Sequence, residues 1–317
     1  MSVRKRHHST AAQNESFHIH KIIVVERKSN YNSAEKAKAK GFLVEKIMNF
    51  FYTKRIMSVS LLVIDPQNDF CSPAGSLYVP GAEKDSARLA EFVEKNMSKI
   101  DSVFVTLDCH PYFHIAHPNF WVGKDGNAPK PFTTITHKDF ENGVYTPAVV
   151  GLKPRVDAYL MSLESQGRYE LTIWPPHCIL GTEGFCVYPE VWNSLNNWEK
   201  LSPGNSIDYV IKSNSPLTEH YSAVRAEVQD AADNSTKTNY SFIEKLKRMD
   251  MIFVAGQALS HCVANTLRDL FIYIQPKKVA LIQDCCSPVK MYEKIGEEFL
   301  EEYTSKGMNI ITSQDSI

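Results

Sequence analysis

Short apolar runs alternate with helix-like segments along most of the chain after Met57. The runs are strand-sized and rich in β-branched residues, and they fall at Ser60–Ile64, Val103–Leu107, Glu170–Trp174, Ile207–Lys212, Met251–Ala255, Val279–Gln283 and Met308–Thr312. Between most of them lie helix-like segments at Glu83–Asn96, Arg155–Gln166, Val191–Lys200, Tyr240–Arg248, Cys262–Tyr273 and Met291–Ser305. Continuous apolar strands that alternate with helices predict an α/β fold with three layers, α/β/α, around a mostly parallel central sheet.

Two segments depart from this pattern. Residues 1–56 hold 12 Lys and Arg against 4 Asp and Glu, and we interpret them as a basic N-terminal extension, poorly ordered or partly helical. An organelle-targeting peptide is the alternative, although early acids and the apolar Ile22–Val25 do not favour it. Residues 109–153 have little periodicity and many Pro, His and Gly, which predicts a loop insertion within a domain spanning 57–317.

Composition narrows the classes of protein. Hydrophobic residues make up 43% of the 317 residues, enough for a sizeable core, and the part after residue 56 is acidic, which disfavours nucleic acid as a partner. The seven cysteines are odd in number and form no C-x-x-C pair, so a reducing compartment such as the cytoplasm is expected. No apolar run reaches the roughly 18 residues of a membrane span, so no membrane partner is expected.

Polar residues stand where the predicted strands end. In a parallel sheet all carboxyl ends meet at one edge, where open α/β folds bind their ligands. We therefore expect five distant side chains to converge there: Asp65, Asp108, His177, Lys212 and Cys262.

Asp65, Lys212 and Cys262 form one chemical set. A free thiol has a pKa near 8.5, so a nearby cation such as Lys212 would favour the nucleophilic thiolate. Asp65 could take the thiol proton and return it to a leaving amine. Cys262 is also predicted to begin the helix Cys262–Tyr273, whose first N–H groups could hold an oxyanion.

Asp108, His110 and His177 form a second set. One carboxylate and two imidazoles suit a divalent metal with open coordination positions, zinc first and iron or manganese as alternatives. Glu219 is a further, less certain ligand. Three other histidines compete for the same role: His114, His117 and His137.

From Met57 onward the chain resembles the isochorismatase-like cysteine hydrolases, and within them the nicotinamidases, also called pyrazinamidases. The resemblance covers about four-fifths of the chain and rests on motifs in the family's order. They are Asp65–Phe70 (DPQNDF), Asp108–Pro111 (DCHP), Trp174–Cys178 (WPPHC), Lys212 after an apolar strand, and Gly256–Val263 (GQALSHCV).

The resemblance implies a role for each matching residue. Asp65 would be the acid/base, Lys212 its partner and Cys262 the nucleophile, with Asp108, His110 and His177 as metal ligands. Backbone N–H groups of Ala258 and Cys262 would form the oxyanion hole, beside a cis peptide at Gln257–Ala258. Phe70 and Trp174 would stack on the substrate ring; core packing is the alternative for both.

The implied reaction is hydrolysis of nicotinamide to nicotinate and ammonia, a step of NAD salvage, by a homo-oligomer. The alternatives are a hydrolase of another small amide or a non-catalytic, metal-binding member of the fold. The chain departs from the family at Cys109, often Trp, at His114–Phe120, where H-x-S-F is usual, and at Gln257, often small and apolar. These departures affect the shape of the pocket more than its chemistry.

Overall fold

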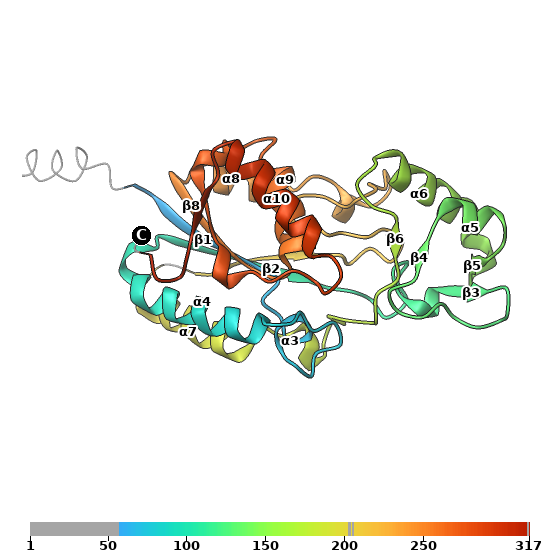
Figure 1. Cartoon of the computed structure of the whole chain (residues 1–317), viewed down its shortest axis with the longest axis horizontal. Coiled ribbons are helices and arrows are strands. Elements are labelled where there is room, and N and C mark those ends of the chain that lie inside the picture. The colour runs from blue at the N-terminus through green and yellow to red at the C-terminus, as the bar shows by residue number, and fades with distance from the viewer. Residues whose placement is uncertain (1–56, 202–203, 205, 316) are drawn as a thin grey trace, which may run out of the picture. The chain divides into compact units, whose positions relative to one another are not determined.

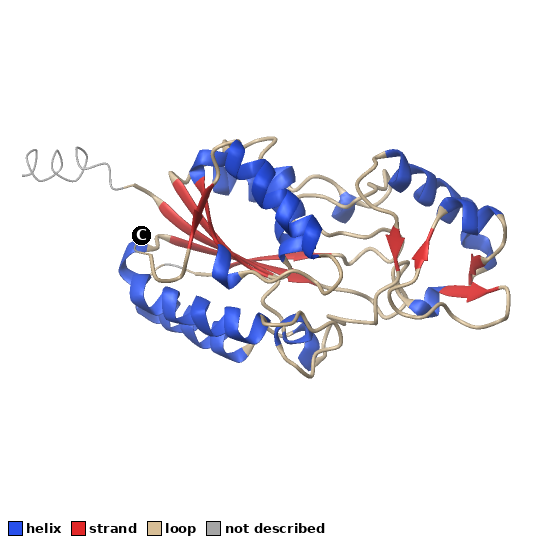
Figure 2. Ribbon diagram, viewed as in Figure 1, coloured by secondary structure: helices blue, strands red, loops and turns tan. Residues whose placement is uncertain are grey.

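The central layer is a six-stranded sheet in which every neighbouring pair of strands is parallel. The computed structural model describes residues 57–317 except 202, 203, 205 and 316, so the predicted N-terminal extension lies outside the described residues. The strands, drawn in red in Figure 2, follow the order β10-β9-β8-β1-β2-β7. They span Val59–Ile64 (β1), Ser102–Asp108 (β2), Asp208–Lys212 (β7), Met251–Gly256 (β8), Val279–Ile282 (β9) and Asn309–Ile311 (β10).

Helices cover both faces of this sheet, which confirms the predicted three-layer α/β/α class. In Figure 1, α4 and α7 lie below the sheet and α8, α9 and α10 lie above it. Helix α4 shows why: it buries Leu89, Phe92 and Val93, a stripe of helical spacing, in the core of the sheet. The helices span Ala82–Asn96 (α4), Pro189–Leu201 (α7), Tyr240–Lys247 (α8), Ala264–Leu270 (α9) and Glu293–Ser305 (α10).

The strand predicted at Glu170–Trp174 is not part of this sheet. Its residues form a two-residue strand, β6 (Leu171–Thr172), that pairs antiparallel with β4 (Thr134–Ile135). Strands β3 (Trp121–Gly123) and β5 (Tyr145–Pro147) form a second such pair. The segment 109–153 therefore contains short strands and helix α5 (His137–Glu141), but strands of two or three residues are too short to show periodicity.

A second hydrophobic core lies beneath these short strands. Helix α6 (Lys153–Ser165) contributes Leu160 to it, and Phe120 and Trp121 are fully buried there. The same core contains Phe70 and Trp174, so it supports the side chains that wall the pocket described below. Within the part of the chain that the structure describes, no helix combines the length and apolarity needed to cross a membrane.

Gly256, the last residue of β8, sits where only glycine fits. It pairs with Ile64 of β1, has a φ of 120°, and a Cβ added to it would lie 2.0 Å from the Ile64 carbonyl oxygen. The close approach of these strands directs the chain into the Gln257–Ala258 peptide, which is cis as the resemblance implied. Gly256 therefore sets the position of the turn that carries Cys262.

We predict that Gly256→Ala lowers the free energy of unfolding by about 3 kcal/mol or more, because its Cβ meets backbone atoms that cannot move aside. Gly126→Ala is the matched control: Gly126 has a φ of 82° but open space around its Cβ position, so about 1 kcal/mol is expected. Urea denaturation of both variants measures the difference. Equal losses of unfolding free energy in the two variants would show that the contact with Ile64 does not add to the cost of replacing Gly256.

Candidate active site and metal centre

Four of the predicted residues meet at the carboxyl edge of the sheet. Asp65 directly follows β1, while Asp108 and Lys212 are the last residues of β2 and β7 and are register partners. Cys262 reaches the same edge from the turn after β8. Along the chain, β2 and then β7 lie on one side of β1, whereas β8, β9 and β10 lie on its other side. The strand order therefore reverses next to β1, and the site lies at this point.

Lys212 joins the other three groups. Its Nζ lies 3.1 Å from Asp65 Oδ2 and 2.9 Å from Asp108 Oδ1. It also lies 3.7 Å from the Cys262 sulfur, and the side chain is only 3% exposed. Burial alone would lower the pKa of Lys212, but Asp108 and Asp65 raise it well above its usual value. The amine is therefore a fixed ammonium ion between two carboxylates and a thiol.

The thiol of Cys262 is not held as a thiolate. Burial raises its pKa well above the usual value; Lys212 lowers it, and Asp65 raises it again. Lys212 therefore favours the thiolate, as expected, but burial outweighs the effect of the lysine. The thiol proton needs a base at the moment of attack.

Asp65 is the base within reach. Its carboxylate lies close enough to Cys262 to interact with the thiol, and burial raises the pKa of Asp65 although Lys212 lowers it. A raised pKa makes a carboxylate a better proton acceptor. Asp65 also has a φ of 45°, in the left-handed region, where its N–H donates to Thr106 Oγ1 at 3.0 Å. The Thr106 hydroxyl donates in turn to Asp65 Oδ1 at 2.5 Å, which fixes the carboxylate.

Cys262 lies within a π-helical turn, Leu259–Val263, and α9 begins only at Ala264. The prediction that Cys262 begins the helix is therefore wrong, because Cys262 lies inside this π turn and α9 begins two residues later. The Val263 N–H donates to the Ala258 carbonyl at 3.1 Å, five residues back, which is the wider spacing of a π turn. This turn brings Cys262 and the Ala258 backbone to the same pocket, where their proposed oxyanion role stays a prediction.

Asp108, His110 and His177 form a compact group of potential metal ligands. Asp108 Oδ2 lies 3.1 Å from His110 Nε2 and 3.3 Å from His177 Nε2, and all three residues are buried. The Pro175 carbonyl accepts a hydrogen bond from His177 Nδ1 at 2.8 Å, which leaves the Nε2 lone pair for a metal. Ligands with this spacing can each lie about 2 Å from one ion, so the group fits a divalent metal.

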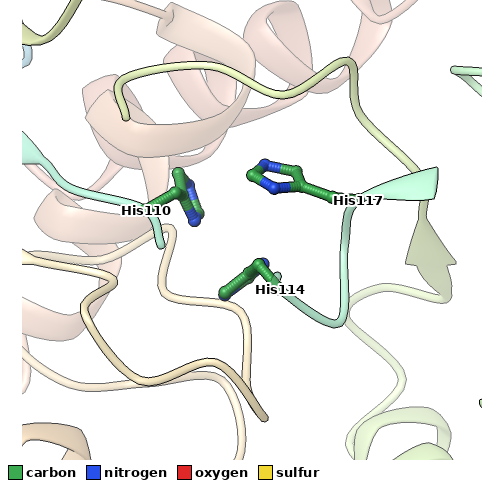
Figure 3. Close-up of side chains that lie close together, drawn as sticks. All are labelled: His110, His114 and His117. Atoms are coloured by element: carbon green, nitrogen blue, oxygen red, sulfur yellow. The ribbon is translucent and has the colours of Figure 1, made fainter. Parts of the chain in front are cut away.

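Glu219 and the remaining histidines lie in different places. Glu219 lines the pocket beside this group without joining it; Oε1 accepts the His220 N–H at 2.9 Å, and the buried Oε2 has no hydrogen-bond partner. His114 and His117 lie close to His110 (Figure 3). His137 is in α5 and is bonded to Asp157, so it does not compete for the metal.

The pocket in front of Cys262 has aromatic walls. Phe70 and Trp174 both line it, as predicted, and both are buried. Two further walls, Tyr221 and His261, were missed by the sequence analysis. Trp174 Nε1 donates to the Tyr221 hydroxyl at 3.2 Å, and the Trp174 ring lies 5.3 Å from that of His261, edge to face. A flat aromatic substrate suits such walls.

Two other contributors were also missed. Gln67 anchors Asp108 by donating from Nε2 to its carbonyl at 2.7 Å and by accepting its N–H at Oε1, also at 2.7 Å. Thr106 holds Asp65 as described above. The signal for Thr106 was present: it is a polar residue in the apolar strand β2, two positions before Asp108 and so on the same face.

The chain is similar in sequence to known nicotinamidases. No family model matches the chain. The nicotinamidase of Saccharomyces cerevisiae is 23% identical over 252 residues, which cover 80% of this chain and 98% of the yeast protein. The nicotinamidase of Escherichia coli is 24% identical over 259 residues, covering 81% and 95%.

Solved structures show the same fold. The structure of the yeast nicotinamidase matches with a TM-score of 0.55 at 21% identity and covers 80% of this chain and 99% of its own. A nicotinamidase/pyrazinamidase structure from Acinetobacter baumanii gives 0.56 at 22% identity, covering 83% and 99%. The curated relatives confirm the resemblance to nicotinamidases, and the solved structures confirm the fold.

We predict that Asp65→Asn lowers the pKa of the Cys262 thiol in the metal-free protein. The change removes a negative charge that raises this pKa and leaves Lys212 in place, so alkylation of Cys262 shifts to lower pH. The measurement is the pH dependence of iodoacetamide labelling at Cys262, located by peptide mass spectrometry. Asp125→Asn, on the surface, should leave the curve in place. An unchanged or higher thiol pKa in Asp65→Asn would contradict this electrostatic description.

Proposed function

We propose that this protein hydrolyses nicotinamide to nicotinate and ammonia, and so serves NAD salvage. One observation carries the proposal: a buried thiol, Cys262, lies beside an ammonium, Lys212, and a carboxylate of raised pKa, Asp65. These are the groups that amide hydrolysis through a thioester needs. The relatives named nicotinamidase, at 23 to 24% identity, support the same reaction.

The first half of the reaction forms a thioester. Asp65 accepts the thiol proton as the Cys262 sulfur attacks the carboxamide carbon. Backbone N–H groups of Ala258 and Cys262 stabilise the oxyanion that forms. When the intermediate collapses, the carbon–nitrogen bond breaks and Asp65 gives its proton to the departing ammonia.

The second half releases the acid. Asp65, again a carboxylate, takes a proton from water as the water oxygen attacks the thioester carbon. The carbon–sulfur bond then breaks, and Asp65 returns its proton to the sulfur. The acid leaves and releases its remaining carboxyl proton to solvent, which gives nicotinate. Lys212 remains protonated throughout and offsets the negative charge of whichever of Asp65 or Cys262 is ionised.

Phe70 and Trp174 orient the substrate by stacking on its ring. Asp108, His110 and His177 would hold the metal, for which zinc is the first candidate and iron or manganese are alternatives. When bound, the metal supplies a Lewis acid at the pocket wall, to which a pyridine nitrogen is a suitable ligand. Glu219 is then a nearby carboxylate that could ligate or orient water.

We predict that Cys262→Ala lowers ammonia release from nicotinamide at least about 10³-fold, because no other group in the pocket can form the thioester. Cys186→Ser changes an exposed cysteine and should keep full activity. Near-normal turnover by Cys262→Ala would show that Cys262 is not the nucleophile.

A panel of other small amides separates the alternatives. Preference for an amide other than nicotinamide would show that nicotinamide is not the substrate, and no turnover of any amide would show that the protein is not an amide hydrolase.

We predict that removal of metal with dipicolinate lowers nicotinamide turnover by about 10-fold or more, because the ring loses one of its positioning contacts. Adding Zn²⁺, Fe²⁺ or Mn²⁺ back to separate samples should restore activity with one ion better than the others. Elemental analysis must accompany each assay. Full activity in protein that is free of metal would remove the metal from the proposal.

A further inference from the structure

A second group of imidazoles lies beside the Asp108 group. His110, His114 and His117 are all fully buried, and one potential ligand atom from each lies within 4.8 Å of the others. Ring centroids are 4.4 Å apart for His110 and His114, 5.0 Å for His110 and His117, and 5.2 Å for His114 and His117. Figure 3 shows the three rings gathered in the segment that follows β2. The reaction proposed above makes no use of His114 or His117.

Backbone carbonyls determine where two of these rings carry their hydrogen. His117 Nδ1 lies 3.2 Å from the Tyr112 oxygen, and since a carbonyl only accepts, Nδ1 must donate. The lone pair of His117 is therefore on Nε2, which is buried and has no hydrogen-bond partner. His114 donates from Nε2 to the Thr218 oxygen at 3.1 Å. Its Nδ1 accepts the Ala116 N–H at 3.2 Å, a hydrogen bond that an ion bound at this nitrogen would displace.

The third ring, His110, belongs to both groups. Its Nε2 faces Asp108, and its Nδ1 on the other edge is buried without a hydrogen-bond partner. When Nε2 keeps its hydrogen and donates it to Asp108, Nδ1 has a free lone pair. When Nε2 gives its lone pair to a metal beside His177, Nδ1 carries the hydrogen instead. A neutral His110 therefore serves one group at a time.

The surroundings suit a cation. The Thr218 and Tyr112 carbonyls each hold one hydrogen of His114 and His117, which leaves the second nitrogen of each ring able to offer a lone pair. The buried Glu219 Oε2 has no hydrogen-bond partner, and the carboxylate is close enough to His110 to interact with it electrostatically. A carboxylate thus lies near a group of imidazoles, the ligand type preferred by zinc and similar borderline metals.

We propose that His110, His114 and His117 form a second, alternative position for a divalent ion of the zinc class. It shares His110 with the Asp108 group, so the chain holds one ion at either position and not at both. Each ligand presents a nitrogen whose hydrogen is fixed elsewhere, and Thr218 and Tyr112 supply the outer hydrogen bonds that orient ligand rings. An ion would remain bound here if His177 were lost.

The test counts Zn²⁺ and Co²⁺ bound by the full-length, untagged chain in equilibrium with a chromophoric chelator. His177→Ala should still bind the ion, about 10-fold or more weakly, and His117→Asn should bind as the wild type does. The double variant, His177→Ala with His117→Asn, should bind one ion fewer per chain than the wild type. Asparagine retains a donor for the Tyr112 carbonyl but lacks Nε2. Because other histidines near the N-terminus can also bind metal, only differences between variants are used.

His177→Ala combined with His137→Asn is the matched control, since His137 belongs to neither group, and it should bind as His177→Ala alone does. If His177→Ala does not fold, Asp108→Asn replaces it as the variant that weakens the first position. Loss of the ion in His177→Ala alone, or an unchanged count in the double variant, would overturn the second position. One ion fewer in His117→Asn alone would overturn the sharing of His110. These counts are independent of nicotinamide turnover, so they stand apart from the proposed reaction.

Discussion

The site depends on one buried ammonium. Lys212 is almost inaccessible to water and lies between the carboxylates of Asp65 and Asp108. Removing one partner of a buried charge group leaves an uncompensated charge, at a cost of about 3–5 kcal/mol. The three charges can meet only if β1, β2 and β7 are parallel, adjacent and in this register. The chemistry of the pocket is thus a direct consequence of the order of the strands.

Asp108 connects that ammonium to the metal centre. Its Oδ1 contacts Lys212, and its Oδ2 contacts both His110 and His177. Burial alone would raise the pKa of Asp108, but His110 and Lys212 hold it well below the usual range. Asp108 therefore stays ionised while Asp65, with a raised pKa, is free to exchange a proton. Two carboxylates on neighbouring strands have different tasks because their neighbours differ.

The sequence was sufficient to predict the sheet and the convergence of its polar strand ends, because buried parallel strands leave continuous apolar runs and their carboxyl ends share one edge. It misplaced the strand at 170–174, since periodicity cannot distinguish a short antiparallel strand from a strand of the central sheet. It also missed the π turn at Cys262, in which the Val263 N–H bonds to the Ala258 carbonyl while the Leu259 N–H bonds to the distant Ser287 carbonyl.

The sequence alone could not decide which of the additional histidines lie near the metal ligands. Sequence spacing left His114, His117 and His137 equivalent, but the fold sends His137 to α5 and the other two to His110. Similarly, Tyr221 and His261 reach the pocket only through the packing of segments far apart in the chain. Thr106 was within reach of sequence reasoning, as a lone hydroxyl in an apolar strand.

The central claim is that the Cys262 sulfur carries the acyl group during turnover. Rapid acid quenching of the wild-type protein while it consumes nicotinamide, followed by peptide mapping, tests this most directly. The account predicts a nicotinoyl group on the peptide that contains Cys262. A nicotinoyl group on any other residue, or sustained turnover with Cys262 unmodified at every quench time, would contradict it.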